Sequence, residues 1–89
     1  IRKIAELQLK KLAERLRDSL YATLKWDEGA LNYLAERGYE PSFGARPLKR
    51  VIQQEVETPL SRKIVAGEVK EGDTIIIKGQ KEGLEFLIS

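Results

Sequence analysis

With 89 residues, 42% of them hydrophobic and 34% charged, the chain has the composition of one small folded domain with a modest core and no membrane span. The absence of cysteine excludes disulfides, and the absence of histidine as well leaves almost no room for zinc sites, Ser-His-Asp catalysis or histidine acid–base chemistry. The net charge of +2 is too weak by itself to indicate a nucleic-acid partner.

Residues 1 to about 19 are rich in Leu, Lys, Glu and Arg, and they predict a helix with one apolar face. Ile4 and Leu7 fall off that face and form a second apolar patch at a spacing of three residues. This patch is either a widened core stripe or a surface for a ligand or a domain outside the chain, and the two alternatives weigh equally. Because the sequence begins with Ile1 rather than Met, we expect a fragment of a longer protein.

Residues 20–26 alternate between apolar and polar types and predict a half-buried strand. Asp27 then suits the N-cap of a short helix that runs to about Arg37, with Gly38 as its C-terminal stop. Gly29 lies inside this helix, where glycine costs about 1 kcal/mol relative to alanine. No function is assigned to Gly29.

Residues 39–44 contain both proline and glycine and predict a loop. A helix is predicted next, over residues 46–57, and Pro47 suits its first position because the fixed φ fits there and the missing N–H would be unpaired anyway. Pro59 either kinks this helix or begins a second one, which ends near residue 66.

Two segments near the end of the sequence, residues 74–77 and 84–88, are β-branched or apolar and predict strands. The glycine-containing residues 79–83 between them predict a hairpin connection. The order of elements is therefore helix, strand, helix, helix, helix, strand, strand. This order predicts an α+β domain, with helices packed on a small three-stranded sheet, and we expect residues 1–89 to form that single domain.

Three cations lie around the start of the helix predicted at residue 46, namely Arg46, Lys49 and Arg50. The positive end of a helix dipole disfavours each exposed cation by about 0.3–1 kcal/mol, so the cluster suits an anion, above all a phosphate. The alternative is that Arg46 caps carbonyl groups or pairs with a glutamate, while the other two are ordinary surface charge. The sequence has no phosphate-cradling glycine loop and no base to activate a nucleophile, so we predict no catalysis by this chain alone.

Residues 39–50, with the sequence YEPSFGARPLKR, closely resemble the signature that opens the lid subdomain of Clp/heat-shock-100 AAA+ ATPases. Residues 1–9, 51–61 and 67–73 resemble the same subdomain in ClpB-like disaggregases. The resemblance covers essentially the whole chain. It implies the C-terminal small (lid) subdomain of the second AAA+ module of a ClpB-like protein.

The resemblance also implies roles for particular residues. Arg46 matches the sensor-2 arginine, which is expected to reach the γ-phosphate of ATP held on the large subdomain. Gly44 and Ala45 would let the backbone approach the nucleotide closely. Ile4 and Leu7 match apolar side chains that press on adenine. The implied cofactor is ATP or ADP, with Mg²⁺ held outside this chain and no metal ligand within it.

At the level of the whole protein, the resemblance implies a nucleotide-sensing and oligomer-coupling module, not catalytic alone, in a cytoplasmic, ATP-hydrolysing stress-response chaperone. The implied partners are the large AAA+ subdomain of the same chain, the neighbouring subunits of a hexameric ring and, through the parent, protein substrates. Neither nucleic acid nor membrane is expected.

Two alternatives remain beside this hypothesis. A winged-helix nucleic-acid-binding domain has the same order of elements, and its recognition helix would begin at Arg46. Glu55 and Glu57 on that helix, together with the small net charge, argue against it. The second alternative is a protein-interaction module that uses no nucleotide.

Overall fold

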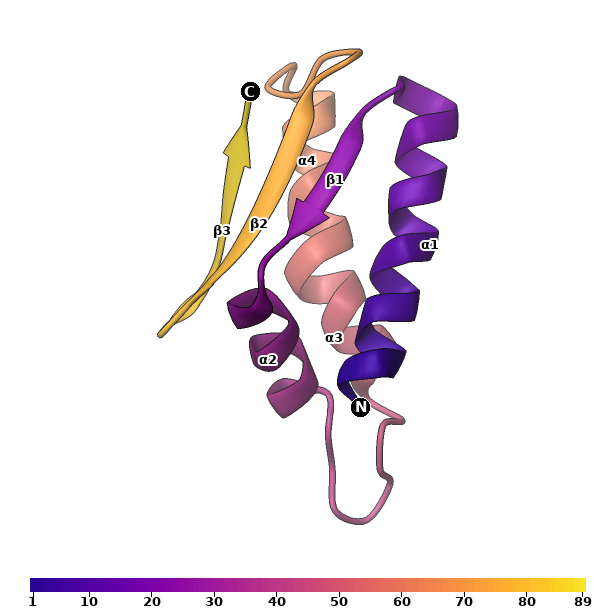
Figure 1. The fold of residues 1–89 in the computed structure, drawn as a ribbon, viewed down its shortest axis with the longest axis vertical. Coiled ribbons are helices and arrows are strands. Elements are labelled where there is room, and N and C mark those ends of the chain that lie inside the picture. The colour runs from indigo at the N-terminus through magenta and orange to yellow at the C-terminus, as the bar shows by residue number, and fades with distance from the viewer.

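Helices cover one face of a three-stranded sheet in the computed structural model, which describes residues 1–89 (Figure 1). The elements in chain order are α1 (Arg2–Leu20), β1 (Thr23–Trp26), α2 (Glu28–Arg37), α3 (Leu48–Ile52), the π-helical segment η1 (Gln53–Glu57), α4 (Thr58–Val65), β2 (Thr74–Gln80) and β3 (Gly83–Ile88). The α+β class predicted from the sequence is confirmed. None of the helices combines the length and apolar character that a membrane crossing requires.

The sheet is mixed, with β2 in its centre. β1 runs parallel to β2, with Leu24 opposite Ile75, and β2 runs antiparallel to β3, with Ile77 opposite Phe86. A parallel pair needs a long crossover connection, and here α2 and the helix from α3 to α4 supply it. Ile75 and Ile77 are fully buried, because alternate residues of a strand share one face and this face meets the helices.

The core lies between that face of the sheet and the helices, and each helical element and the central strand contribute to it. Burying one large aliphatic side chain stabilises the fold by about 1.5–3 kcal/mol. No polar or charged side chain is buried. The largest fully buried side chains are those of Leu9, Leu34, Leu48, Val56, Leu60, Ile75 and Ile77.

β1 is shorter than the strand predicted over residues 20–26. Leu20 ends α1, and Tyr21 caps that helix in the left-handed conformation with φ of 54°. The Tyr21 N–H donates to the Arg17 carbonyl at 3.0 Å, which satisfies one of the last carbonyl groups of the helix. The apolar alternation runs on through this cap because Leu20 and Ala22 both pack toward the core.

The hairpin between β2 and β3 is tighter than predicted. β2 extends to Gln80 and β3 starts at Gly83, so only Lys81 and Glu82 form the turn. Most of the predicted connection over residues 79–83 therefore lies within the strand ladder. Glycines led to the wrong boundary here, because a glycine inside a strand also marks a close approach of another backbone.

α3, η1 and α4 form one continuous helix that runs from Leu48 to Val65 (Figure 1). Of the two alternatives predicted for Pro59, the start of a second helix is therefore wrong, and the helix continues past the proline. Pro59 lies inside the helix, although it lacks an N–H and its ring crowds the carbonyl four residues earlier. The wider π-helical turn comes directly before it, and the Thr58 N–H donates to the Gln53 carbonyl five residues back. This turn gives the proline ring the room that a regular α-helix would deny it.

Candidate functional site

The loop over residues 39–47 carries the candidate site and projects from the end of the molecule where α2 and α3 meet (Figure 1). Gly38, which ends α2 as predicted, is buried and has an ordinary φ of −87°. Gly38 packs so closely against Leu48 that no side chain fits, because a Cβ atom there would lie 2.9 Å from the Leu48 Cα. The two ends of the loop are therefore held close together by packing.

Backbone hydrogen bonds close the loop on itself. The Glu40 N–H donates to the Gly44 carbonyl at 2.8 Å, and the Gly44 N–H donates to the Glu40 carbonyl at 2.6 Å. Gly44 adopts a φ of +61° with open space where a Cβ would lie, so glycine serves the backbone conformation here. A left-handed conformation costs most other residues about 1–2 kcal/mol. The open space at Gly44 is also consistent with the close approach of another molecule.

Arg46 lies in the turn before α3 rather than in the first turn of a helix, so its predicted position on the helix is wrong. α3 begins at Leu48, and Pro47 is its N-cap residue with φ of −75°. The Arg46 N–H donates to the Phe43 carbonyl at 3.2 Å, and the Leu48 N–H donates to the Ala45 carbonyl at 3.0 Å. These bonds form a tight turn whose position is set by the core contact of Leu48.

A groove of about 530 Å³ lies beside this turn and carries all three predicted cations. No ion pair involves Arg46, Lys49 or Arg50, and the only acidic residue along the groove is Glu40. The Glu40 carboxylate accepts a hydrogen bond from the Ser42 N–H at 3.3 Å. The groove is therefore rich in unpaired positive charge. Its lining residues are Glu40, Phe43, Arg46, Pro47, Lys49, Arg50 and Gln53.

The guanidinium of Arg46 stacks on an aromatic ring instead of pairing with a carboxylate. Its Cζ lies 4.8 Å from the centre of the Phe43 ring, and its side chain makes no hydrogen bond within the chain. The alternative in which Arg46 caps carbonyls or pairs with a glutamate is therefore wrong. Phe43 was not singled out in the sequence, and the signal that could have found it is an aromatic residue three positions before an arginine in a glycine-containing loop.

The remaining predicted site residues lie around the groove rather than along it. Ala45 packs against the core. Ile4 and Leu7 lie on α1 with 43% and 58% of their surface exposed, so they are not part of a widened core stripe. Gln8, one helical turn after Ile4, lines a second groove together with Lys49, which also borders the Arg46 groove. α1 thus approaches one of the unpaired cations, Lys49, through Gln8.

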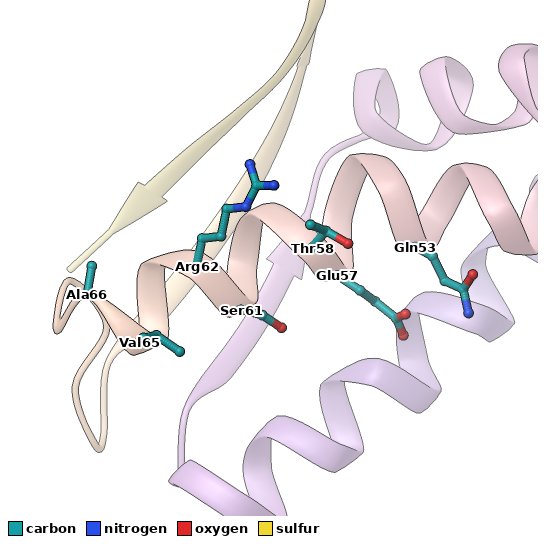
Figure 2. A pocket seen from close by; sticks show the side chains of 7 residues that line it. All are labelled: Gln53, Glu57, Thr58, Ser61, Arg62, Val65 and Ala66. Atoms are coloured by element: carbon teal, nitrogen blue, oxygen red, sulfur yellow. The ribbon is translucent and has the colours of Figure 1, made fainter.

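Another groove, of about 690 Å³, follows one side of η1 and α4 (Figure 2). Figure 2 shows Glu57 extending toward α1, where its carboxylate pairs with Arg15 at 2.5 Å. Val65, on the rim of this groove, is 88% exposed. No pattern in the sequence indicates this groove. Its lining residues are Gln53, Glu57, Thr58, Ser61, Arg62, Val65 and Ala66.

A polar contact joins α2 to η1. The Tyr33 hydroxyl donates to the Glu55 carboxylate at 2.5 Å, and this hydrogen bond raises the pKa of Tyr33 above its ordinary value of 10.0. The guanidinium of Arg37 lies 4.5 Å from the centre of the Tyr33 ring. No three acidic, histidine or cysteine side chains are grouped so that they could hold a metal ion.

The comparisons with known proteins decide the family. The family described as "C-terminal, D2-small domain, of ClpB protein" matches residues 1–77. This chain belongs to the ClpB D2-small family. It is similar to the chaperone protein ClpB of Meiothermus ruber, with 52% identity over 83 residues, or 93% of this chain. It is similar also to ClpB of Rickettsia felis, with 49% identity over 88 residues, and of Rickettsia conorii, with 46% identity over 89 residues.

The chain spans about a tenth of the length of these ClpB relatives. The predicted resemblance to the second AAA+ module of the ClpB disaggregase family is therefore confirmed for the C-terminal small domain. The family assignment favours this domain over the winged-helix alternative, which has the same order of elements. The groove with unpaired cations lies within the matched residues.

Proposed function

We propose that this ClpB D2-small domain is a nucleotide-sensing lid, in which Arg46 contacts the γ-phosphate of ATP held mainly by a large AAA+ subdomain outside this chain. The observation that carries the proposal is that Arg46, Lys49 and Arg50 line one groove and none of them has a carboxylate partner. An arginine presents a permanently charged, planar set of donors that matches phosphate geometry.

The groove fits a phosphate better than a neutral ligand. Its single carboxylate, that of Glu40, faces three cations, so the groove has an excess of positive charge. Charge-assisted hydrogen bonds to an anionic oxygen are about twice as strong as neutral ones. Bound ATP would supply the phosphoryl group that is hydrolysed elsewhere. The role of this chain is to hold the guanidinium of Arg46 at the position of the γ-phosphate, which ATP carries and ADP lacks.

The apolar patch of Ile4 and Leu7 completes the proposed nucleotide contact. Both side chains are exposed on α1, and Gln8, one helical turn after Ile4, lines a groove together with Lys49. Exposed aliphatic side chains next to a polar groove suit the flat, apolar face of a purine base. Gly44 and Ala45 give the loop its conformation and its low bulk beside Arg46.

In the parent protein we propose that residues 1–89 form one lid domain of a cytoplasmic, ATP-hydrolysing AAA+ disaggregase, with Mg²⁺ bound outside the lid. Its partners would be the large AAA+ subdomain of the same chain and neighbouring subunits of a hexameric ring, with protein substrates reached through the parent. The groove along α4, with its exposed Val65, supplies a surface for such contacts. The lid alone would not hydrolyse ATP.

The test is Arg46→Ala in the full-length ClpB-family protein that contains this chain, with ATP turnover as the measurement. Loss of a hydrogen bond to a charged group costs about 1.5–3 kcal/mol, so turnover is expected to fall about ten- to hundredfold. The matched control is Arg17→Ala, which removes the same charge from the exposed surface of α1. Turnover of this control is expected to stay unchanged.

The same substitution in the 89-residue chain separates sensing from folding. Arg46 is exposed and makes no ion pair, so Arg46→Ala is expected to change the free energy of unfolding by less than about 0.5 kcal/mol. A large loss of stability would assign Arg46 a structural role. Unchanged turnover in the full-length variant would contradict the sensor role and favour the alternative of a protein-interaction module without nucleotide.

A further inference from the structure

Phe43 is a large apolar side chain that the fold leaves in solvent. Its side chain is 57% exposed, and it takes no part in the hydrophobic core. The loop that carries it is closed by the two hydrogen bonds between Glu40 and Gly44, and its N–H donates to the Glu40 carbonyl at 3.0 Å. The chain thus holds an exposed aromatic ring in a fixed position, which needs a reason other than burial.

One cation lies over the ring, and that cation is the guanidinium of Arg46. The Arg46 Cζ lies 4.8 Å from the ring centre, within the distance at which a cation is attracted to an aromatic face. The same turn connects the two residues through the hydrogen bond from the Arg46 N–H to the Phe43 carbonyl. Backbone and side chain therefore fix the arginine relative to the ring.

Stacking and hydrogen bonding use different parts of a guanidinium. The centre of the Arg46 guanidinium lies over the Phe43 ring, and the N–H donors of a guanidinium lie in its own plane and point outward from it. No carboxylate or carbonyl of this chain accepts from those donors. The stack therefore orders the long side chain and leaves its phosphate-binding groups free.

We propose that Phe43 is a positioning residue for Arg46, and that it acts by holding the guanidinium in the groove before the phosphate arrives. This inference rests on the proposed function, in which Arg46 contacts the γ-phosphate. An arginine that is ordered in advance loses less side-chain freedom on binding. Removing the ring is expected to weaken binding of the triphosphate about two- to tenfold.

The chain offers a matched control in the same loop. Tyr39 is also an exposed aromatic residue, but no cation stacks on its ring. Tyr39→Leu removes a comparable amount of apolar surface without touching Arg46. Phe43→Tyr keeps an aromatic face under the guanidinium and is expected to retain the affinity that Phe43→Leu loses.

The experiment measures the dissociation constants of ATPγS and ADP for the full-length ClpB-family protein by calorimetry. The variants are Phe43→Leu, Phe43→Tyr, Tyr39→Leu, Arg46→Ala and the double variant Phe43→Leu/Arg46→Ala. Phe43→Leu is expected to weaken ATPγS two- to tenfold and to leave ADP nearly unchanged, because only ATPγS carries the γ-phosphate. In the Arg46→Ala background the same substitution is expected to have no further effect, because its target is gone.

A second measurement on the 89-residue chain reports the stack itself. In NMR spectra the ring current of Phe43 is expected to shift the Arg46 side-chain N–H resonance, and this shift is lost in Phe43→Leu, kept in Phe43→Tyr and unaffected by Tyr39→Leu. The dispersion of the same spectra shows that each variant is folded.

The outcomes separate this inference from the proposed function. Unchanged ATPγS affinity in Arg46→Ala contradicts the sensor role itself. Weaker binding in Arg46→Ala but not in Phe43→Leu leaves the sensor role standing and overturns the positioning role. A Phe43→Leu effect of equal size with and without Arg46 shows that the ring acts on the nucleotide by its own contact, which also overturns it.

Discussion

Gly29 in the first turn of α2 and Gly79 in β2 lie backbone against backbone. A Cβ atom on Gly29 would be 3.0 Å from the Gly79 carbonyl oxygen, and a Cβ atom on Gly79 would overlap the peptide group of Gly29. Neither glycine has a positive φ, so the absence of a side chain serves this contact rather than a special conformation. The helix-propensity cost of Gly29 is thus offset by the close packing of α2 on the sheet.

Gly79→Ala is expected to lower the free energy of unfolding by about 1–3 kcal/mol or more, which is the typical cost of overpacking. The measurement is urea unfolding of the 89-residue chain. Lys81→Ala in the exposed turn of the same hairpin is the control, with an expected change below about 0.5 kcal/mol. Equal unfolding midpoints for Gly79→Ala and the parent chain would contradict the contact.

Asp27 secures the same junction with its carboxylate. Its Oδ1 accepts from the Ala30 N–H at 2.8 Å and from the Gly79 N–H at 3.0 Å. These hydrogen bonds, first that from Gly79, lower the pKa of Asp27 below its ordinary value of 3.8. One side chain therefore caps α2, as the sequence predicted, and also ties that helix to β2.

The lowered pKa of Asp27 predicts a loss of stability in acid. As the pH falls, the Asp27 carboxylate takes up its proton at a higher pH in the unfolded chain than in the folded one. The contribution of ionised Asp27 to the free energy of unfolding is therefore complete well above pH 3.8 and is lost as the pH falls through the lower native pKa. Asp27→Asn removes this ionisation, so its deficit relative to the parent chain is expected to shrink below about pH 4. Urea unfolding at a series of pH values measures it. A deficit that is constant across this range, or one matched by Asp18→Asn on α1, would refute the assignment.

The raised pKa of Tyr33 predicts a pH dependence of stability opposite in sign to that of Asp27. Because the hydrogen bond to Glu55 raises the pKa of Tyr33 above 10.0, the folded chain keeps its proton to a higher pH than the unfolded chain. The contribution is complete below pH 10 and is lost as the pH rises through the native pKa. Tyr33→Phe is expected to cost about 0.5–1.5 kcal/mol at neutral pH and to unfold with a weaker alkaline dependence. Tyr39→Phe, at an exposed tyrosine without a hydrogen bond, should show neither effect.

The fold was largely predictable because local sequence patterns indicate most of its helices and strands. The helical spacing of Leu9 with its neighbours, the cap at Asp27 and the β-branched run around Ile75 each involve residues that are close in sequence. The Arg46 cluster and the position of Ile4 and Leu7 off the core stripe were predictable for the same reason, whereas the sequence left open whether that patch is exposed. An unusual residue type at an unexpected position is visible without any knowledge of distant contacts.

The missed features depend on contacts between distant residues or on backbone geometry. The reason for Gly29 lies at Gly79, fifty residues later along the chain, and no local pattern connects them. The π-helical turn before Pro59 depends on which carbonyl each N–H reaches, which is a matter of backbone geometry rather than of sequence pattern. The stack of Phe43 on Arg46 lies in a loop whose backbone is closed by hydrogen bonds between Glu40 and Gly44, a geometry that no local residue pattern specifies.

Substitutions in the exposed apolar patch of Ile4 and Leu7 test whether that patch belongs to the nucleotide site. Because both side chains are substantially exposed, the double substitution Ile4→Ser/Leu7→Ser is expected to change the free energy of unfolding of the 89-residue chain by less than about 1 kcal/mol. Leu9→Ala on the buried face of the same helix is the contrasting variant, with an expected loss of about 2–5 kcal/mol. A double variant as unstable as Leu9→Ala would show that Ile4 and Leu7 contribute to the packing of the core.

In the full-length protein the same double variant should weaken ATPγS and ADP by a similar factor, because the adenine base is common to both nucleotides. Arg46→Ala is expected to behave differently and to weaken ATPγS alone. Calorimetric dissociation constants for both nucleotides measure this contrast. If the double variant binds both nucleotides as tightly as the parent, the patch contacts another part of the assembly, and the site consists of the Arg46 groove without an adenine contact from α1.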